Sequence, residues 1–377
     1  MIRSRWFKFA LAALGSAAAT AACDAPALAA PITAGNLVVY RVGDGSAALT
    51  NAGTAVFLDE YTATGTLVQS IALPTAANGS NLPLVASGTA TSEGLLTRSA
   101  DGRFIVLAGY GTTAGTAGVA SSASTSVPRV IGLINAQGTV DTTTGLTDAA
   151  SANNPRSATS TNGTDLWLTG GAGGIRYATK GGTTSTQLST DVTNLRQTNI
   201  FNGQLYVSTS SGTAVRLGTV GTGTPTASGQ SITNLLGIPA TGSPYAFHLA
   251  DLSTTMDGPD TLYLTDDTAN TISKFSLVGG TWTLNNTVAA TSVRGLTASV
   301  SGTTVSLYAT NGTLLTSLTD TAGYNANNNG TLATIATAAT NTAFRGVALA
   351  PVPEPGSVAV IGLAAVSLLA GRRRRRI

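Results

Sequence analysis

The sequence is poor in the residue types that carry most enzyme chemistry. Its 377 residues include one cysteine, Cys23, and one histidine, His248. These counts exclude a disulfide framework, a cysteine zinc site and any metal site with two histidine ligands. A serine hydrolase triad would need His248 as its base, yet the chain has no G-x-S-x-G elbow. We therefore expect no catalytic residues and no cofactor.

Charge is also scarce, at 10% of residues, and aromatic residues make up 5%. The formal net charge is +3, but eight basic residues lie near the termini. Without these, 12 Lys and Arg face 16 Asp and Glu once Asp24 is set aside, so the body is mildly acidic. Such a body offers no basic face to nucleic acid. The two terminal basic clusters flank apolar segments, which indicates a membrane as partner instead.

Residues 1–29 have the pattern of a secretory signal peptide. A basic start, MIRSRWFK, precedes the apolar and small-residue run 9–22, which is short for a membrane helix. Ala27-Leu28-Ala29 fits an A-x-A site with cleavage before Ala30. The alternative lipoprotein cleavage at Cys23 fits less well, because Thr20 stands where that signal prefers leucine. Cleavage at Ala30 leaves a mature chain without a thiol.

The C-terminal segment combines a proline-flanked glutamate, an apolar run and an arginine cluster. Residues 356–371 carry no charge and would form a helix roughly 24 Å long, which flanking arginines can extend across a membrane. The positive-inside rule places the arginines in the cytoplasm and the body outside it. We therefore predict a transmembrane helix with a membrane anchor of five residues: Arg372, Arg373, Arg374, Arg375 and Arg376.

This tail resembles the PEP-CTERM sorting signal of Gram-negative bacteria, with Val352, Pro353, Glu354 and Pro355 as its motif. The resemblance covers residues 351–377, about the last 25 residues, and says nothing of the body. It implies that a membrane enzyme, exosortase, recognises the motif and processes the tail. It also implies a cell-surface or extracellular location and a link to exopolysaccharide and biofilm. The inner membrane would anchor the protein only in transit.

The body, residues 30–350, is built from a repeat. Each copy has a short leading stretch, a turn rich in Gly, Asn or Asp, and a β-prone stretch; the turns Asp101-Gly102, Asn162-Gly163 and Asn202-Gly203 are hairpin signals. The copies start 40 to 58 residues apart, and the longest includes the insertion 111–126. Five copies are complete and a sixth is truncated: RSADGRFIVLAGY, RSATSTNGTDLWLTGG, RQTNIFNGQLYVSTSSG, HLADLSTTMDGPDTLYLTDD, RGLTASVSGTTVSLYATNG and RGVALAP.

Four strands per repeat of this length are typical of β-propeller blades, so we predict an all-β propeller. The region 36–73 has only three strands, and 344–350 has one. Their pairing would complete a blade and close the ring, giving six blades. Seven blades is the alternative, because the linker 74–94 has room for another short strand. The low aromatic content leaves a β-sandwich or a β-helix open.

Candidate ligand-binding residues stand at the start of each copy. Five arginines and the single histidine, at one repeat position, would ring the central channel and bind an anion such as an acidic sugar. The alternative, which we favour, is that each arginine pairs with a carboxylate or carbonyl of its own blade. The six residues are Arg98, Arg156, Arg196, His248, Arg294 and Arg345.

Acidic residues cluster at 257–260 and 266–267, but their spacing does not match an EF-hand, so turns explain them better than calcium. The sequence thus predicts an exported, non-enzymatic surface or matrix protein on a propeller scaffold. The alternative is a secreted hydrolase or lyase that acts on polysaccharide.

Overall fold

The computed structural model describes residues 29–353, and its regular structure there is β-strand apart from one 3-10 turn, η1 (Val119–Ser121). Four sheets are separate, and each contains four strands that follow one another along the chain. Their strands are β9 (Pro155–Ser160), β10 (Asp165–Gly170), β11 (Arg176–Thr179) and β12 (Thr186–Gln187); β13 (Thr198–Phe201), β14 (Gln204–Ser208), β15 (Leu217–Val220) and β16 (Ile232–Asn234); β17 (Pro244–Ala250), β18 (Thr261–Asp266), β19 (Thr271–Val278) and β20 (Thr281–Ala289); and β21 (Gly295–Ser301), β22 (Thr304–Thr310), β23 (Leu314–Asp320) and β24 (Ala333–Thr337).

The other strands form one nine-stranded sheet. It contains two runs of four paired strands, β25-β1-β2-β3 and β5-β6-β7-β8, and the short strand β4 pairs with both β2 and β6. The strands are β1 (Leu37–Val42), β2 (Gly53–Tyr61), β3 (Leu67–Ala72), β4 (Val85–Ser87), β5 (Thr97–Arg98), β6 (Phe104–Tyr110), β7 (Arg129–Asn135), β8 (Val140–Leu146) and β25 (Ala343–Leu349).

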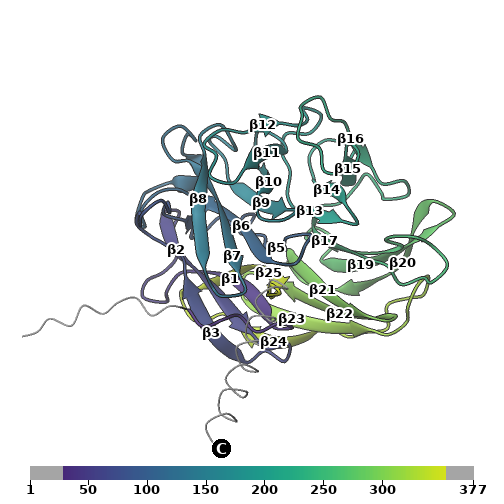
Figure 1. The fold of residues 1–377 in the computed structure, drawn as a ribbon. Helices are drawn as coiled ribbons and strands as arrows, with labels where there is room; N and C mark the ends of the chain where they lie inside the picture. The colour runs from purple at the N-terminus through teal and green to yellow at the C-terminus, as the bar shows by residue number, and fades with distance from the viewer. Residues whose placement is uncertain (1–28, 354–377) are drawn as a thin grey trace, which may run out of the picture.

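The sheets are arranged like propeller blades around a common axis (Figure 1), which confirms the predicted class of fold. Six strands, here called the inner strands, surround that axis: β5, β9, β13, β17, β21 and β25. Contacts run from β25 to β5, to β9 and to β13, then from β14 to β17, and through β21 back to β25, so the circle is closed.

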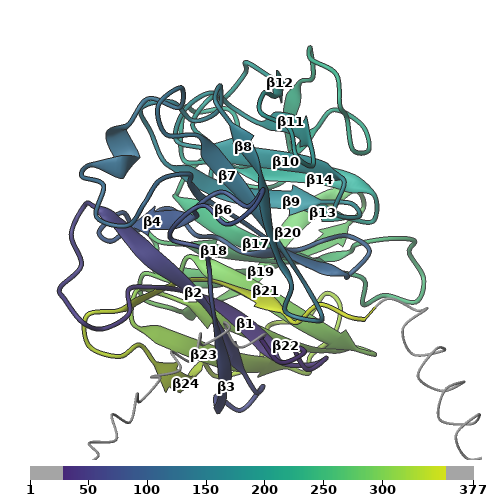
Figure 2. The ribbon, with the colours of Figure 1, turned by 60° about the vertical axis from the view of Figure 1, so that its left-hand side comes forward.

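The predicted closing contact is confirmed. Strand β25 pairs antiparallel with β1, with Leu37 opposite Leu349 and Val42 opposite Ala343. Figure 2 shows the consequence, because the first strands of the chain lie beside the last ones. The linker 74–94 does contain a further strand, β4, which pairs with both β2 and β6.

The predicted hairpin turns are also found. Asn202 and Gly203 join β13 to β14 with φ of 45° and 73°, the positive values that a two-residue type I′ turn requires. The turns around Gly102 and Gly163 likewise connect the first and second strands of their blades. Turn chemistry in the sequence therefore positions the inner strands.

Apolar clusters fill the spaces between neighbouring sheets, built from alternate residues of strands that present both faces to a neighbour. The cluster around Leu37 and Tyr308 joins the closing blade to the last separate sheet. Small and β-branched side chains do most of this packing, which is how a chain with few aromatic residues forms the fold. No helix in residues 29–353 is long and apolar enough to cross a membrane. The predicted C-terminal membrane helix lies outside the described residues.

One buried ion pair joins two neighbouring sheets. Lys274 Nζ lies 2.7 Å from Asp320 Oδ2, and both side chains are essentially inaccessible to solvent. Tyr263 donates its hydroxyl to the same carboxylate oxygen at 2.7 Å, and Lys274 also donates to the carbonyl of Gly323. Each charge thus has its partner, and neither can be removed alone without leaving the other unpaired.

We predict that Lys274→Met lowers the free energy of unfolding by about 3–5 kcal/mol, because Asp320 would remain buried without its counter-ion. The measurement is chemical denaturation followed by circular dichroism. Lys180→Met is the matched control, since Lys180 pairs with Asp141 at 2.6 Å in an exposed position where a loss of about 0–1 kcal/mol is expected. Equal losses in the two variants would contradict this account of Lys274.

Candidate anion-binding axis

Four of the predicted arginines occupy equivalent places just at the start of an inner strand. The Thr169 hydroxyl donates to the carbonyl of Arg196 in the next blade, and the Thr310 hydroxyl donates in the same way to Arg345. The backbone N–H of Arg196 bonds to Ser208, and that of Arg294 bonds to Thr310. We call the four residues the arginine ring: Arg156, Arg196, Arg294 and Arg345.

Arg98 and His248 do not belong to this ring, which corrects the predicted single set of six. Arg98 lies opposite Ile105 and His248 opposite Tyr263, about three residues further along their inner strands. The letters R-S-A recur at 98–100 and 156–158, but the hairpin turn follows Arg98 at once and Arg156 only after four residues. The turn sets the register of a hairpin, so matching letters gave the wrong equivalence.

A cavity of about 330 Å³ lies at the level of Arg98 and His248. Its wall comes from the inner strands β5, β13, β17, β21 and β25, so it lies on the axis. Its polar side chains come from four of these strands, and its apolar wall includes a phenylalanine. The residues that matter for binding are Arg98, Asn199, Phe201, His248 and Thr297.

The guanidinium of Arg98 has spare hydrogen-bonding capacity in this cavity. Its one hydrogen bond within residues 29–353 goes to the carbonyl of Ala350 at 3.4 Å, and no described carboxylate lies within ion-pair distance. Burial lowers its pKa. A buried cation without a counter-ion attracts an anion.

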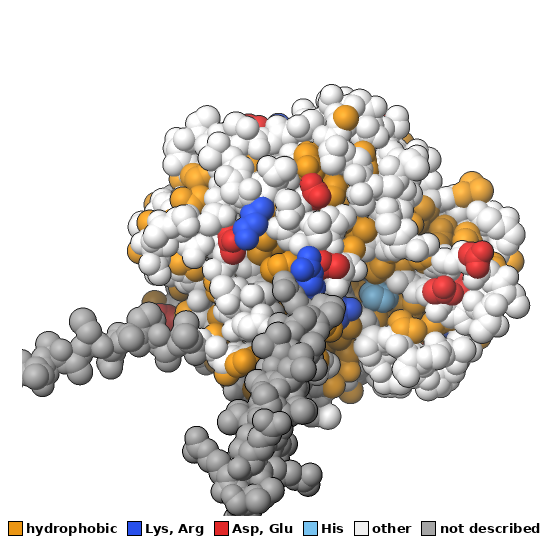
Figure 3. Space-filling model, in the orientation of Figure 1, with side chains coloured by type: hydrophobic (Ala, Val, Ile, Leu, Met, Phe, Trp, Pro, Cys, Tyr) orange, Lys and Arg blue, Asp and Glu red, His pale blue; other side chains and the backbone are white. Residues whose placement is uncertain are grey.

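His248 is half-buried and lies edge-on to the ring of Phe201, with 5.3 Å between centroids. Burial and the nearby charge of Arg98 lower the pKa of His248 to about 4. Its imidazole is therefore neutral at physiological pH, with one nitrogen to donate and one to accept. No described carboxylate pairs with this histidine, which Figure 3 shows in pale blue.

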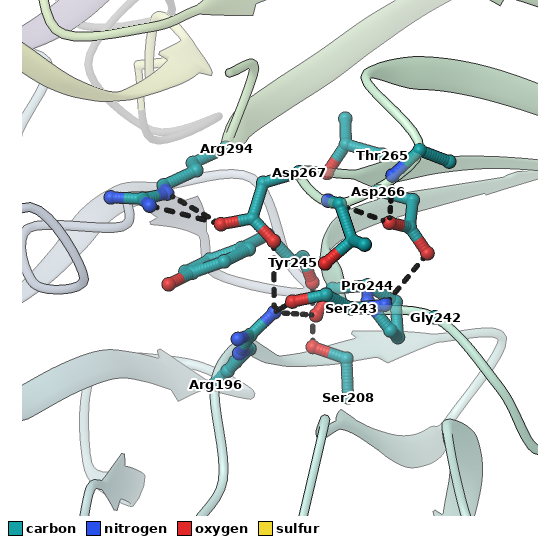
Figure 4. Close-up of polar contacts among 12 residues, drawn as sticks. Arg196, Ser208, Gly242, Ser243, Pro244, Tyr245, Thr265, Asp266, Asp267 and Arg294 are labelled. Atoms are coloured by element: carbon teal, nitrogen blue, oxygen red, sulfur yellow. Dashed lines mark hydrogen bonds and ion pairs between the residues drawn. The ribbon is translucent and has the colours of Figure 1, made fainter.

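The arginine ring lies at the other level of the axis, where the inner strands begin. Tyr245 occupies the equivalent place in the β17 blade, since its carbonyl accepts from the Ser208 hydroxyl of the preceding blade. Figure 4 shows Arg196 and Arg294 on either side of its ring. The guanidinium carbons lie 3.8 Å and 4.8 Å from the ring centroid. Asp267 bonds to Arg294 at 2.9 Å and lies 3.6 Å from Arg196.

These arginines bond to neighbouring blades. Arg156 donates to the side chain of Asn194 and the carbonyl of Leu195, which lead into the next inner strand. Arg196 reaches the hydroxyl of Ser243 and the carbonyl of Pro244 in the same manner. Neither prediction, an anion-binding ring or pairing within each blade, describes this fully. The arginines donate to the blade beside their own, and several of their N–H groups remain unused.

Sequence reasoning missed an acidic residue beside the ring. Glu93 is 3% exposed and accepts hydrogen bonds from the backbone N–H of Ser87 at 2.5 Å and the hydroxyl of Tyr110 at 2.7 Å. Burial raises the pKa of Glu93 to about 7, against the hydrogen bonds and the charge of Arg345, which lower it. Glu93 lies in the irregular segment before β5, outside any repeat, so no pattern marked it.

The aspartates that cluster in the sequence accept hydrogen bonds from different segments of the backbone. Asp260 accepts from the backbone N–H groups of Leu252 and Ser253, while Asp266 accepts from that of Ser243. Within residues 29–353 no three acidic, histidine or cysteine side chains gather as metal ligands would.

The predicted sorting motif lies at the end of the described chain. Val352 donates its backbone N–H to the carbonyl of Gly102 at 2.9 Å, which ties this segment to the β5–β6 turn beside the cavity. Pro353 is the last described residue. The rest of the motif, Glu354 and Pro355, lies outside the described residues, as does the predicted anchor, Arg372 to Arg376. Residues 1–28 of the predicted signal peptide also lie outside them.

No protein-family model matches this chain, and no curated protein matches it in sequence. Among solved structures it is similar to a candidate 6-phosphogluconolactonase from Bacteroides uniformis ATCC 8492, with 17% identity, a TM-score of 0.45, and 80% of this chain and 82% of that one covered. A chain of the nidogen/laminin complex gives 14% identity, a TM-score of 0.47 and coverage of 84% and 98%. The GH74 enzyme of Niastella koreensis gives 16% identity and a TM-score of 0.46, with 81% of this chain and 46% of that one covered.

The raised pKa of Glu93 predicts a pH-dependent contribution to stability. The folded state holds a proton on Glu93 that the unfolded chain, with an ordinary pKa of 4.5, has already lost, so the contribution falls as the pH rises from 4.5 to about 7. Glu93→Gln has no titrating group at this position and so does not lose this contribution. We expect its free energy of unfolding, relative to that of the wild type, to rise by about 2–3 kcal/mol between pH 4.5 and about 7.

The measurement is urea denaturation of both proteins across this pH range. His248 acts in the opposite direction, because its lowered pKa makes the folded state lose stability as the pH falls from 6.5 to about 4. Because both proteins contain His248, its contribution cancels in the difference between their free energies of unfolding. A difference that does not change with pH would contradict the assignment.

Proposed function

We propose that the protein is an exported six-bladed propeller that binds acidic polysaccharide at the axial cavity and does not act on it chemically. The observation that carries the proposal is Arg98, a half-buried cation that lies in a 330 Å³ cavity with no described counter-ion. The number of blades follows if β25-β1-β2-β3 and β5-β6-β7-β8 count as two blades linked through β4.

The cavity suits one sugar unit that carries a carboxylate. Arg98 supplies the fork of N–H donors that matches a carboxylate. The amide of Asn199, the hydroxyl of Thr297 and the neutral His248 supply donors and acceptors for sugar hydroxyls. Phe201 offers an apolar surface against which a sugar ring packs. A volume of about 330 Å³ is at the small end for ligand sites, which fits a single residue of a longer chain.

Export and sorting follow from the two terminal segments. The signal-peptide pattern of residues 1–29 and the PEP-CTERM resemblance of residues 351–377 support delivery to the cell surface or the extracellular matrix. The partners would be exosortase, the membrane in transit and exopolysaccharide. Val352 donates to the carbonyl of Gly102 in the β5–β6 turn, so the described chain ends beside the cavity.

A second candidate function is a polysaccharide hydrolase or lyase, and Glu93 is the observation in its favour. A carboxyl group with a pKa of about 7, bonded to the Tyr110 hydroxyl, has the chemistry of a general acid or base. Its burial argues against this role, since Glu93 is 3% exposed and Tyr110 is inaccessible to solvent. Among the described residues, none of the side chains that line the cavity is acidic. We therefore favour binding without catalysis.

Arg98→Gln is expected to weaken binding of uronate-containing polysaccharide by about tenfold or more, because one charge-assisted contact is lost. Binding is measured on a glycan array and by titration calorimetry with residues 30–353. Lys180→Gln, which removes an exposed charge far from the cavity, is the matched control. Arg294 and Arg345 are poorer test sites, because they hold neighbouring segments in place.

Unchanged binding in Arg98→Gln would reject the cavity as the polysaccharide site. Product release from polysaccharide by the wild type, lost in Glu93→Gln, would instead establish the enzymatic alternative.

Truncation after Pro353 tests the sorting proposal and keeps the Val352–Gly102 hydrogen bond. We expect the truncated protein to appear in the medium of its host and the full chain to remain with the envelope until it is processed. Fractionation followed by immunoblotting measures the two pools. A truncated protein that stays in the envelope fraction would show that the tail is not the retention signal.

A further inference from the structure

The arginine ring carries more positive charge than the structure neutralises. Its four guanidinium groups face three carboxylates, Asp266, Asp267 and Glu93, so the group has a net charge of about +1 when all three are ionised. Arg156 lies near enough to Arg196 and Arg294 for their charges to lower its pKa further, after burial. Like charges held together in a partly desolvated place favour a bound anion.

Unused donors are the second observation. The Nε atoms of Arg156 and Arg345 are buried and have no hydrogen-bond partner within residues 29–353. Arg345 is only 6% exposed, and its two Nη atoms donate to the carbonyls of Phe344 and Gly88. An unpaired donor that is both buried and charged is unfavourable, so an anion that reaches it would be favoured.

The ring is accessible from solvent on one side. The Arg294 side chain is 26% exposed and that of Arg196 is 11% exposed. Tyr245 stacks between these two guanidinium groups (Figure 4). Arg294 already donates from its three nitrogens to Asp267 and to the carbonyl of Thr91. On Arg196, neither Nε nor Nη2 has a partner in the described part of the chain.

We propose that the arginine ring binds a tetrahedral dianion, a sulfate or phosphate group, at the end of the axis opposite the polysaccharide cavity. When Glu93 is protonated the net charge of the group is about +2, which a dianion balances, whereas a single carboxylate would leave half of it. Four oxygens also match donors that approach from different blades better than a planar carboxylate does. This second site is independent of the proposed polysaccharide site.

Protonation of Glu93 regulates this site. Glu93 faces Tyr40 on β1, Tyr110 on β6 and Arg345 on β25, and it also acts on Arg129 on β7. When Glu93 takes up a proton, the net charge of the group rises from about +1 to about +2, because the four arginines stay charged. Anion affinity therefore rises as the pH falls through neutrality.

The first test titrates sulfate into the full folded domain by calorimetry, with chloride at the same ionic strength as the reference. Sulfate is the probe for pH dependence because it stays a dianion over the whole range, so any change comes from the protein. We expect tighter sulfate binding at about pH 5.5 than at about pH 8.5 for the wild type, and no such change for Glu93→Gln. Equal effects of sulfate and chloride on the wild type would overturn the proposal.

Arg156→Gln tests the ring itself and is expected to weaken sulfate binding by about tenfold or more. Arg156→Lys keeps the charge but not the fork of donors, so it should bind more weakly than the wild type and more tightly than Arg156→Gln. Lys180→Gln is the control for loss of one charge. If Arg156→Gln does not fold, as judged by circular dichroism, the lysine variant alone decides, and wild-type affinity there would overturn the proposal.

Separate titrations with sulfate and with phosphate at about pH 8, where both are dianions, identify the preferred ion by the tighter binding. Arg98→Gln should leave both titrations unchanged, because Arg98 lies at the other level of the axis. Loss of sulfate binding in Arg98→Gln would count against two separate sites.

Discussion

The antiparallel pairing of β25 with β1 is the interaction on which the rest of the structure depends. It joins residues about 300 positions apart and leaves no open edge between the first and the last blade. It also brings Arg345 beside Arg294 and Glu93, so the arginine ring exists only in the closed propeller. The described chain has no cysteine to reinforce the contact, and hydrogen bonds and packing must hold it.

Close approach of the backbone makes this closure compatible with small residues. Gly346 lies so near the next inner strand that a Cβ atom there would be 2.3 Å from the backbone nitrogen of Leu96. Gly295 is similarly close to the carbonyl of Arg345. In both places glycine directly follows a ring arginine, so the inner strands can touch while the guanidinium reaches the neighbouring blade. Any larger residue would push the strands apart and widen the ring.

Much of the fold was predictable because it depends on local signals. Turn dipeptides such as Asn202-Gly203 fix the hairpins, and the missing strand of region 36–73 identifies its partner at 344–350. The ring was only partly predictable. Matching residue letters placed Arg98 and His248 with the four arginines. The distance of each residue from its hairpin turn, which that match ignored, sets the register and moves them to a second level.

Glu93 and Tyr245 were not predictable by the same reasoning. Glu93 reaches the ring through the segment between β4 and β5, whose path depends on contacts with three blades. Tyr245 stands where four of the other inner strands have arginine, so a search for the repeated residue passes over it. Residues that interrupt a repeat therefore deserve the same scrutiny as those that keep it, because the interruptions distinguish one blade from another.

The structural and the ligand-binding roles of the arginine ring do not exclude each other. A guanidinium has five N–H groups, and the bonds to the neighbouring blade use only some of them on each arginine. Those bonds fix the orientation of the side chain, so the remaining donors are held in place before any anion arrives. Such preorganisation lowers the entropic cost of binding. In a chain with so few charges, contacts that hold the blades together can thus also prepare a binding site.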